Sequence, residues 1–123
     1  MPPSGAFQLG GESKTVPFSK ITDGLSDTIF AGEKTVSIDS FGRGWLDCST
    51  YDGDQPACST RGGAVPTLAQ SPREASYTFG SYHPGICQFV FGDGHVEALR
   101  VSIKPDTLAM MLTINDGCVI PDY

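Results

Sequence analysis

The residues best suited to chemistry are a histidine and an aspartate in the second half of the 123-residue chain. Nine residues separate His83 from Asp93, and Ser81 stands two positions before the histidine. A histidine and a carboxylate act together as an acid–base pair only within hydrogen-bond reach. If the apolar run 86–92 is extended at about 3.3 Å per residue, it holds the two about 20 Å apart. No G-x-S-x-G sequence surrounds Ser81. We therefore interpret these as turn residues and expect no catalytic residue.

A second group of polar residues lies in the middle of the chain. Asp52 and Asp54 offer the oxygen ligands that calcium prefers, but their spacing does not match an EF-hand. We favour acidic turn residues that face water, and expect no metal or cofactor. Trp45 is either a core anchor, which we favour, or an exposed binding residue. These three residues mark a possible binding surface.

The four cysteines, Cys48, Cys58, Cys87 and Cys118, raise the question of redox state. They form no C-x2-C pair, and only two histidines could complete a zinc site. Disulfides are favoured over reduced buried thiols, with three connectivities possible. We predict Cys48–Cys58, which brackets a turn-rich loop, and Cys87–Cys118, which ties a strand to the C-terminus. The entropy of loop closure would stabilise the folded protein by roughly 3 kcal/mol for the first bond and roughly 4 kcal/mol for the second. Such bonds imply export from the cytoplasm.

Length and composition limit the fold and the partners. One domain over residues 1–123 is expected, with 1–13 as an irregular N-terminal segment. With Gly 15 and Pro 9, the hydrophobic residues (39%) come in short runs, which favours strands and turns. The net charge of -6, without a Lys/Arg cluster, argues against nucleic acid and anionic membranes as partners. The longest apolar run, 108–112, is far too short to span a bilayer.

An Asp-Gly pair between two apolar runs predicts a β-hairpin at about 86–101. In a two-residue type I′ turn, Asp93 and Gly94 both need a positive φ. Phe91 would then pair with Val96. This register places one mostly apolar face of the hairpin on the core.

The remaining pattern predicts an α+β fold dominated by strands, with an antiparallel sheet. Short strands are expected at 14–18, 28–36 and 118–120. One short C-terminal helix is expected at about 105–114, with a proline at its first position. The residues 37–75 form a long loop that needs the first disulfide as a staple.

Two runs of the sequence resemble a known family. His83, followed after nine residues by Asp93-Gly94, is similar to the H-x9-D-G domain of prepilin-like proteins (DUF1559-like) that are abundant in planctomycete bacteria. The upstream run 21–33 resembles a second signature of that family, and the resemblance covers residues from about 5 to the C-terminus. The residues that carry it are Asp23, Gly24, Gly32, Glu33, His83, Asp93 and Gly94.

The resemblance implies a non-enzymatic structural subunit, the globular domain of a pseudopilin-like exported protein of a type II secretion or pilus-type assembly. Its partners would be protein subunits of that assembly, including copies of itself. Its location would be the periplasm, cell envelope or cell surface of a bacterium. The sequence as given lacks the cleavage site and hydrophobic N-terminal helix of that family. The alternative is an exported module that binds glycans or calcium through the 37–75 loop.

Overall fold

The computed structural model describes residues 5–7, 15–43, 47–51, 55–62 and 66–123. The interpretations of Trp45, Asp52 and Asp54 concern residues outside these ranges. The elements within them, in chain order, are the 3-10 helix η1 (Phe18–Lys20), strand β1 (Ile29–Gly32), the 3-10 helix η2 (Ile38–Ser40), helix α1 (Pro56–Ser59), strands β2 (Ile86–Phe91) and β3 (Val96–Arg100), and helix α2 (Pro105–Leu112).

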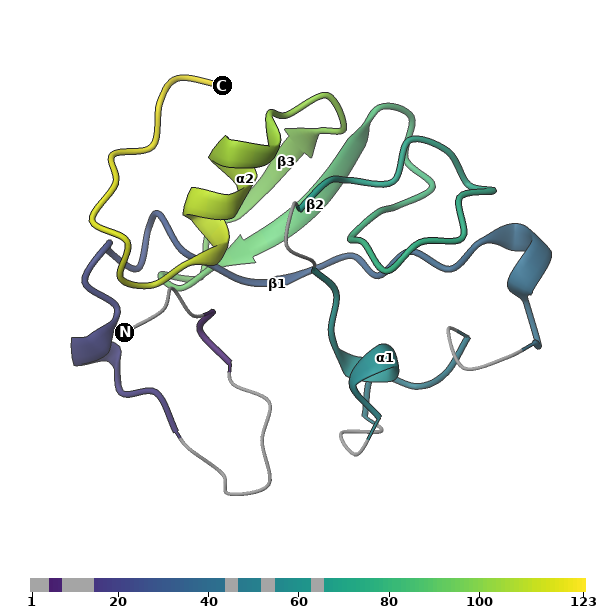
Figure 1. Cartoon of the computed structure of the whole chain (residues 1–123), viewed down its shortest axis with the longest axis horizontal. Helices are drawn as coiled ribbons and strands as arrows, with labels where there is room; N and C mark the ends of the chain where they lie inside the picture. Colours follow the sequence, from purple (N-terminus) through teal and green to yellow (C-terminus); the bar gives the residue numbers. More distant parts are fainter. Residues whose placement is uncertain (1–4, 8–14, 44–46, 52–54, 63–65) are drawn as a thin grey trace.

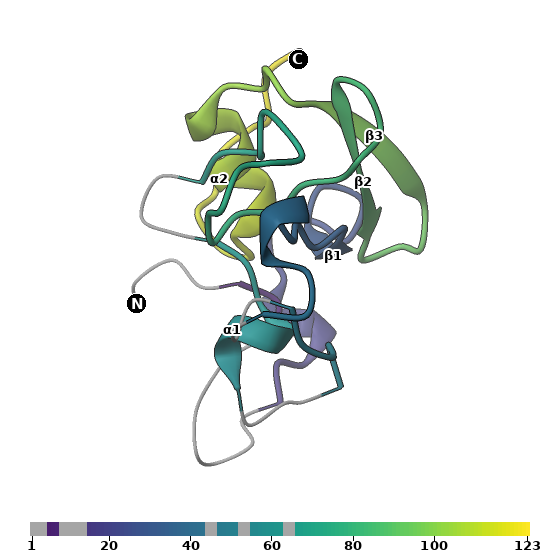
Figure 2. The same ribbon diagram turned by 90° about the vertical axis from the view of Figure 1, so that its right-hand side faces the viewer.

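The three strands form one antiparallel sheet in the order β1-β2-β3, so β2 is the central strand. Helix α2 lies across one face of this sheet, and the segment between β1 and β2 extends away from it with α1 (Figure 1). The turned view in Figure 2 separates α2 from α1 in the same way. The predicted α+β class, with an antiparallel sheet and one short C-terminal helix, is confirmed.

The core lies between the sheet and α2. Alternate residues of β2 point into it, as expected for a strand with one covered face: Cys87, Phe89 and Phe91 are buried. They meet Leu99 of β3, and Leu108 and Met111 of α2. Each such side chain contributes about 1.5–3 kcal/mol when fully buried. This contact fixes α2 on the sheet.

The predicted C-terminal helix is confirmed at Pro105–Leu112, with proline at its first turn and Asp106 beside the positive end of the helix dipole. The expected strand 118–120 is not formed. Gly117 has a φ of 70°, a left-handed turn, which redirects the chain after the helix. The chain therefore ends as an irregular tail, not as a fourth strand.

Two other strand predictions need correction. The predicted strand 14–18 is wrong in its described part, where Phe18 begins η1. Pro17 supplies the carbonyl that accepts the Lys20 amide, at 2.9 Å, and this local bond favours the 3-10 turn. The predicted strand 28–36 is shortened to Ile29–Gly32.

The β2–β3 hairpin is confirmed, but its predicted register is wrong by one residue. Val96 pairs with Val90 and not with Phe91. The loop has three residues, 92–94, closed by the Gly94 amide, which donates to the Phe91 carbonyl at 2.9 Å. Among the described residues only glycines have positive φ, and in this loop Gly94 does, at 91°. The three-residue hairpin with a left-handed glycine therefore replaces the predicted type I′ turn.

The reason for this register is a tertiary contact. The amide of Gly92 donates to the Thr28 carbonyl at 3.0 Å, and that of Asp93 donates to the Leu25 carbonyl at 3.1 Å. Both turn amides are thus satisfied by the segment that leads into β1. The wider three-residue loop presents them to it.

The long loop 37–75 is stapled as predicted by the Cys48–Cys58 disulfide. Cys58 lies in the single turn of α1 and is buried. Arg61, just beyond α1, donates to the carbonyls of Ala57 at 2.6 Å and of Thr35 at 3.1 Å. These bonds tie α1 to the chain that follows β1. No helix in the described ranges has the length and apolar character needed to cross a membrane.

Candidate functional site

Glu33 and His83, one from each motif run, lie side by side. Glu33 follows β1 and His83 precedes β2, so the antiparallel pairing of the two strands brings these positions together. The Nε2 atom of His83 lies 3.3 Å from Oε1 of Glu33, with side chains 52% and 33% exposed. The second carboxylate oxygen, Oε2, accepts a hydrogen bond from the backbone amide of Gln88 at 2.7 Å. The carboxylate is therefore held in place by one oxygen, while the side chain remains partly exposed.

A hollow of about 480 Å³ opens at this pair. Two half-exposed rings flank it, Phe41 from the 37–75 loop and Tyr82 from the turn before β2, with centroids 6.1 Å apart. The Tyr82 hydroxyl donates to the Val36 carbonyl, which fixes its ring. The remaining lining residues are Glu33, Lys34, Thr35, Val36, Gly80, Ser81 and His83.

Glycine at position 80 allows the chain to form the wall of this hollow. A Cβ at Gly80 would lie 2.6 Å from the Cβ of Ala69 and 2.9 Å from that of Thr35, closer than real atoms approach. The Gly80 amide donates to the Glu33 carbonyl at 3.0 Å. The close approach therefore sets the distance between the two motif runs.

The Ser81 side chain stabilises the turn that carries His83. Its hydroxyl donates to the Ile86 carbonyl at 2.6 Å and accepts the His83 backbone amide at 3.1 Å. The imidazole Nε2 is directed at Glu33 instead. The arrangement of a serine hydrolase, in which the base takes the hydroxyl proton, is not present.

Burial shifts the pKa of two residues that line the hollow. Burial, followed by the nearby Arg61 guanidinium, lowers the pKa of Lys34, whose amine donates to the Cys48 carbonyl at 2.5 Å. Burial, followed by the Asp47 carboxylate, raises the pKa of the Tyr82 phenol. Tyr82 is therefore a neutral ring at physiological pH.

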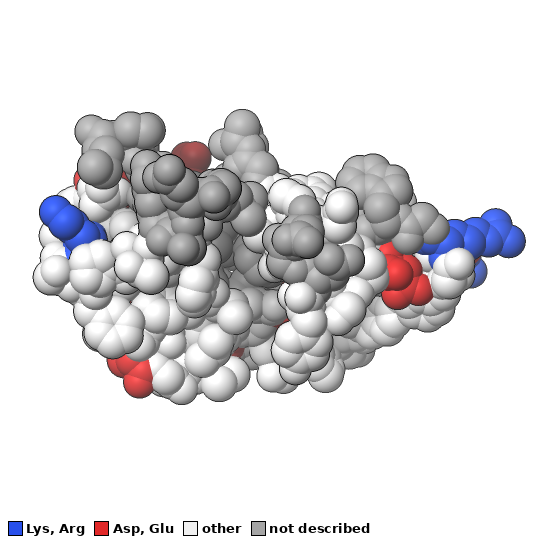
Figure 3. Space-filling model, turned by 90° about the horizontal axis from the view of Figure 1, so that it is seen from below, with Lys and Arg blue, Asp and Glu red and all other residues white. Residues whose placement is uncertain are grey.

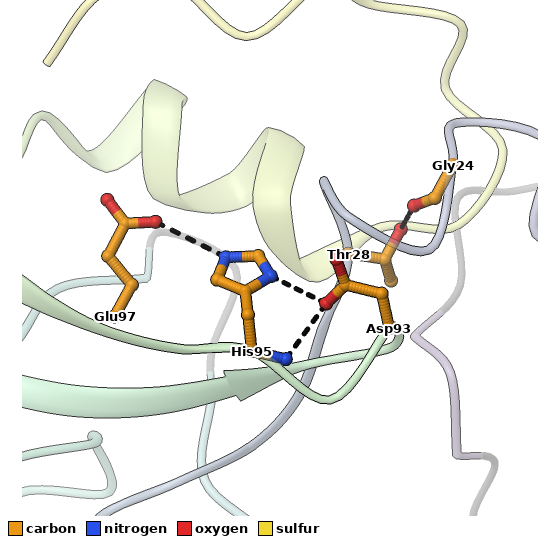
Figure 4. A network of polar contacts seen from close by, with 5 residues as sticks. All are labelled: Gly24, Thr28, Asp93, His95 and Glu97. Carbon is orange, nitrogen blue, oxygen red and sulfur yellow. Dashed lines mark hydrogen bonds and ion pairs between the residues drawn. The ribbon is translucent and has the colours of Figure 1, made fainter.

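A second polar centre lies at the hairpin loop, at the other end of β2 (Figure 4). The Asp93 carboxylate accepts the His95 backbone amide at 3.0 Å and lies 2.5 Å from its ring Nδ1. On the other side of the imidazole, Nε2 lies 3.6 Å from Oε2 of Glu97. Close by, the Thr28 hydroxyl donates to the Gly24 carbonyl at 2.9 Å. The turn and the first motif run thus lie together.

Asp93 and His95 shift each other's pKa. The backbone and then the side-chain hydrogen bond from His95 lower the pKa of Asp93. In return, the hydrogen bond to Asp93 raises the pKa of His95, with a smaller contribution from Glu97. The imidazole also stacks on Phe91, with centroids 4.5 Å apart. Both ring nitrogens face carboxylates, so His95 is suited to stabilise the loop.

The structure therefore places His83 and Asp93 in different centres. Each has its own partner, Glu33 for the histidine and His95 for the aspartate. The remaining motif residues support the fold. Asp23 accepts the amides of Asp116 and Gly117, at 2.8 and 2.9 Å.

The motif glycines are required either by their backbone conformation or by the lack of space for a side chain. Gly24 has a φ of 100° in the turn that precedes β1. A Cβ at Gly32 would lie 2.5 Å from the ring of Phe89, so only glycine lets β1 approach the core aromatic this closely. Gly94, with its positive φ, has open space around it and is required by its backbone alone.

The predicted Cys87–Cys118 disulfide is wrong. Cys87 is a free thiol that faces Leu99 inside the core, and Cys118 is a free thiol exposed on the tail. Burial, with a contribution from Glu33, raises the pKa of Cys87 to about 12. The Asp116 carboxylate raises the pKa of Cys118. Both thiols are therefore protonated at neutral pH.

Among the described residues we find no basic patch on the face drawn in Figure 3 and no cluster of possible metal ligands. On the face drawn in Figure 3, the basic side chains of described residues stand at its two ends and form no patch. In the described part of the chain, no three His, Cys, Asp or Glu side chains come together in a group that could hold a metal ion.

Sequence reasoning missed the aromatic walls and the second histidine. Phe41 gives no local signal, because it meets Tyr82 only through the path of the 37–75 loop. Tyr82 adjoins the motif histidine and could have been noticed there. His95 stands two residues after Asp93, the spacing at which an Asp side chain accepts a backbone amide in an Asx turn, and this signal was available.

Comparison with known proteins identifies the family. No curated protein and no solved structure matches the chain. A family model described as "Protein of unknown function (DUF1559)" matches residues 2–106, most of the chain, including both motif runs and both hairpin strands. The chain therefore belongs to the DUF1559 family.

Proposed function

We propose that the chain is the globular part of a non-enzymatic structural subunit, a pseudopilin-like exported protein of a secretion or pilus-type assembly. Its partners are the protein subunits of that assembly, copies of itself included. Its place is the bacterial periplasm, cell envelope or cell surface.

The observation that carries this proposal is how the motif residues are used. Asp23 fixes the C-terminal tail, Gly32 admits the Phe89 ring, and Gly94 closes the hairpin. Asp93 is engaged by His95. Residues that make internal contacts of this kind maintain the fold. A structural subunit depends on its fold and does not need a reaction centre.

The Cys48–Cys58 disulfide supports the location. Disulfides persist in oxidising compartments such as the periplasm and are rare in the reducing cytosol. This bond staples the 37–75 loop.

The test uses the complete reading frame, expressed with an epitope tag in its source cells. After fractionation, the protein should appear in the cell envelope or medium, with Cys48 and Cys58 linked, and chemical cross-linking should join it to other envelope subunits or to itself. Recovery as a cytoplasmic monomer with four alkylatable thiols would contradict both the location and the role.

One specific observation favours a second candidate, an exported ligand-binding module. Phe41 of the 37–75 loop shares a hollow with Tyr82, Glu33 and His83. The calcium form of this candidate depends on Asp52 and Asp54, which lie outside the described residues. The glycan form is supported by this hollow, whose lining residues are described.

A further inference from the structure

We propose that the hollow formed by Glu33, Phe41, Tyr82 and His83 is a binding site for a neutral saccharide. The proposal rests on the second candidate function and names its site and ligand class. It is compatible with a structural role, because a surface subunit can also bind a glycan.

The size and walls of the hollow suit one or two sugar rings. Its volume of about 480 Å³ falls within the range of about 300–1,000 Å³ typical of small-molecule sites. Phe41 is 54% and Tyr82 49% exposed, and their rings are inclined at 53°. Exposed aromatic rings of this kind offer apolar faces, and the apolar C–H face of a pyranose can pack on such a ring.

The polar groups at the edge complement sugar hydroxyls. A hydroxyl both donates and accepts, and vicinal hydroxyls are best bound by a fixed acceptor beside a donor. Glu33 is the fixed acceptor, held by the Gln88 amide, and His83 Nε2 lies 3.3 Å from it. Both side chains are partly exposed, so they can exchange water for ligand hydroxyls.

The charges argue against the other ligand classes of this size. An anion would meet the Glu33 carboxylate in a protein of net charge -6. A cation, although attracted by Glu33, would meet the amine of Lys34, which lines the same hollow. A neutral ligand with an apolar face and several hydroxyls avoids both costs.

The rigid framework around the site favours binding without large rearrangement. The Tyr82 hydroxyl is bonded to Val36, the Ser81 hydroxyl to Ile86, and Gly80 is packed against Ala69. A site whose walls are held by such contacts loses little conformational entropy when a ligand enters.

The experiment is a titration of the ¹⁵N-labelled 123-residue chain with methyl β-glucoside, diacetylchitobiose and maltotriose, followed by two-dimensional NMR. The expected result is that at least one saccharide shifts the amide signals of Lys34, Ser81 and His83, and leaves those of the hairpin loop unchanged. Phe41→Ala should weaken this binding by about five- to tenfold, the factor for one lost aromatic contact.

Matched variants separate the site from general surface effects. Phe18→Ala removes a phenylalanine that is 66% exposed and lies outside the hollow, and should leave binding unchanged. Tyr82→Phe keeps the ring but removes its bond to Val36, and should retain most of the binding.

Three results would overturn the proposal: no shift with any saccharide, an unchanged dissociation constant in Phe41→Ala, or shifts caused only by N-acetylarginine methylamide, a cationic probe. The last result would assign the hollow to a basic side chain of a protein partner. None of these outcomes bears on the location or cross-linking of the subunit, so failure here and failure of the structural role are distinguishable.

Discussion

Asp23 holds the C-terminal tail to the segment before β1. Its two carboxylate oxygens accept the amides of Asp116 and Gly117, and its own amide donates to the Ile114 carbonyl at 3.3 Å. A residue of the first motif run therefore fixes the chain that follows α2. These bonds hold the tail beyond α2, whereas α2 itself is held by its packing on the sheet.

Replacing Asp23 with Ala should free this tail. Two amides lose charge-assisted partners, which costs on the order of 1–3 kcal/mol of unfolding free energy. Urea unfolding measures this loss, and hydrogen exchange should accelerate at Asp116 and Gly117. The control Asp39→Ala removes an exposed carboxylate paired with Arg73, and should change stability by much less.

Replacing Gly32 with Ala should destabilise the sheet by overpacking. The new Cβ would meet the Phe89 ring at 2.5 Å, and such clashes cost about 1–3 kcal/mol. Phe89→Leu alone also destabilises, because it leaves a cavity. If the clash is the cause, the double variant should lose less stability than the sum of the two single variants in urea unfolding. Strict additivity would contradict this account.

Replacing Gly94 with Val should cost about 1–3 kcal/mol through the backbone alone, because its φ of 91° disfavours a β-branched residue. Apart from the chain neighbours, no atom lies within 4 Å of an added Cβ, so the Cβ itself meets no clash. Gly94→Asn should be less harmful, since asparagine tolerates the left-handed region better. Thermal melts of the wild type and both variants measure this order of stability. A Gly94→Val variant that melts at the temperature of the wild type would contradict the left-handed turn.

The cysteines should differ in reactivity in the folded protein. Iodoacetamide at pH 8 should label Cys118 alone, because Cys87 is buried and its pKa is raised to about 12. Cys87 should react only after unfolding, and peptide mass spectrometry should find Cys48 linked to Cys58. A peptide joining Cys87 to Cys118 would restore the original pairing. Reduction of Cys48–Cys58 should lower stability by roughly 3 kcal/mol or less.

The pair of Asp93 and His95 should make stability depend on pH. The raised pKa of His95 stabilises the fold below its unfolded value of about 6.5, and this contribution is lost as pH rises through the folded pKa. The lowered pKa of Asp93 stabilises the fold above its unfolded value of about 3.9, and this contribution is lost as pH falls through the folded pKa. The two overlap between about pH 4 and 6.5.

The stability difference between the wild type and His95→Gln should therefore be largest in that window, as measured by urea unfolding at a series of pH values. An NMR titration should give His95 a pKa above its usual value, and Asp93→Asn should bring it back toward that value. A pKa of His95 that is the same in Asp93→Asn would show that the pair is not coupled.

Local sequence signals were sufficient for the elements whose residues act alone. Pro105 and Asp106 mark the start of α2, and the Asp-Gly pair marks the hairpin. The register was not available locally, because the turn amides of Gly92 and Asp93 are satisfied by carbonyls some 65 residues earlier in the chain. Choosing between a two- and a three-residue loop requires that contact.

The candidate site was predictable only in part. The motif residues Glu33 and His83 could be named from the sequence, and the pairing of β1 with β2 brings them together. Phe41 could not be assigned, since its position depends on the irregular path of the 37–75 loop. The wrong cysteine pairing has the same origin: the tail that carries Cys118 is directed by Asp23, a contact that cysteine spacing does not reveal.

The Cys48–Cys58 disulfide also determines whether proteolytic cleavage of this loop separates the two parts of the chain. Tyr51 lies between the two cysteines and is 96% exposed, which makes it the kind of aromatic residue that chymotrypsin-like enzymes cleave after. A cut at this point would nick the chain but leave both fragments covalently joined and each anchored in the fold. A chymotrypsin-like protease could thus cleave this loop without releasing either half.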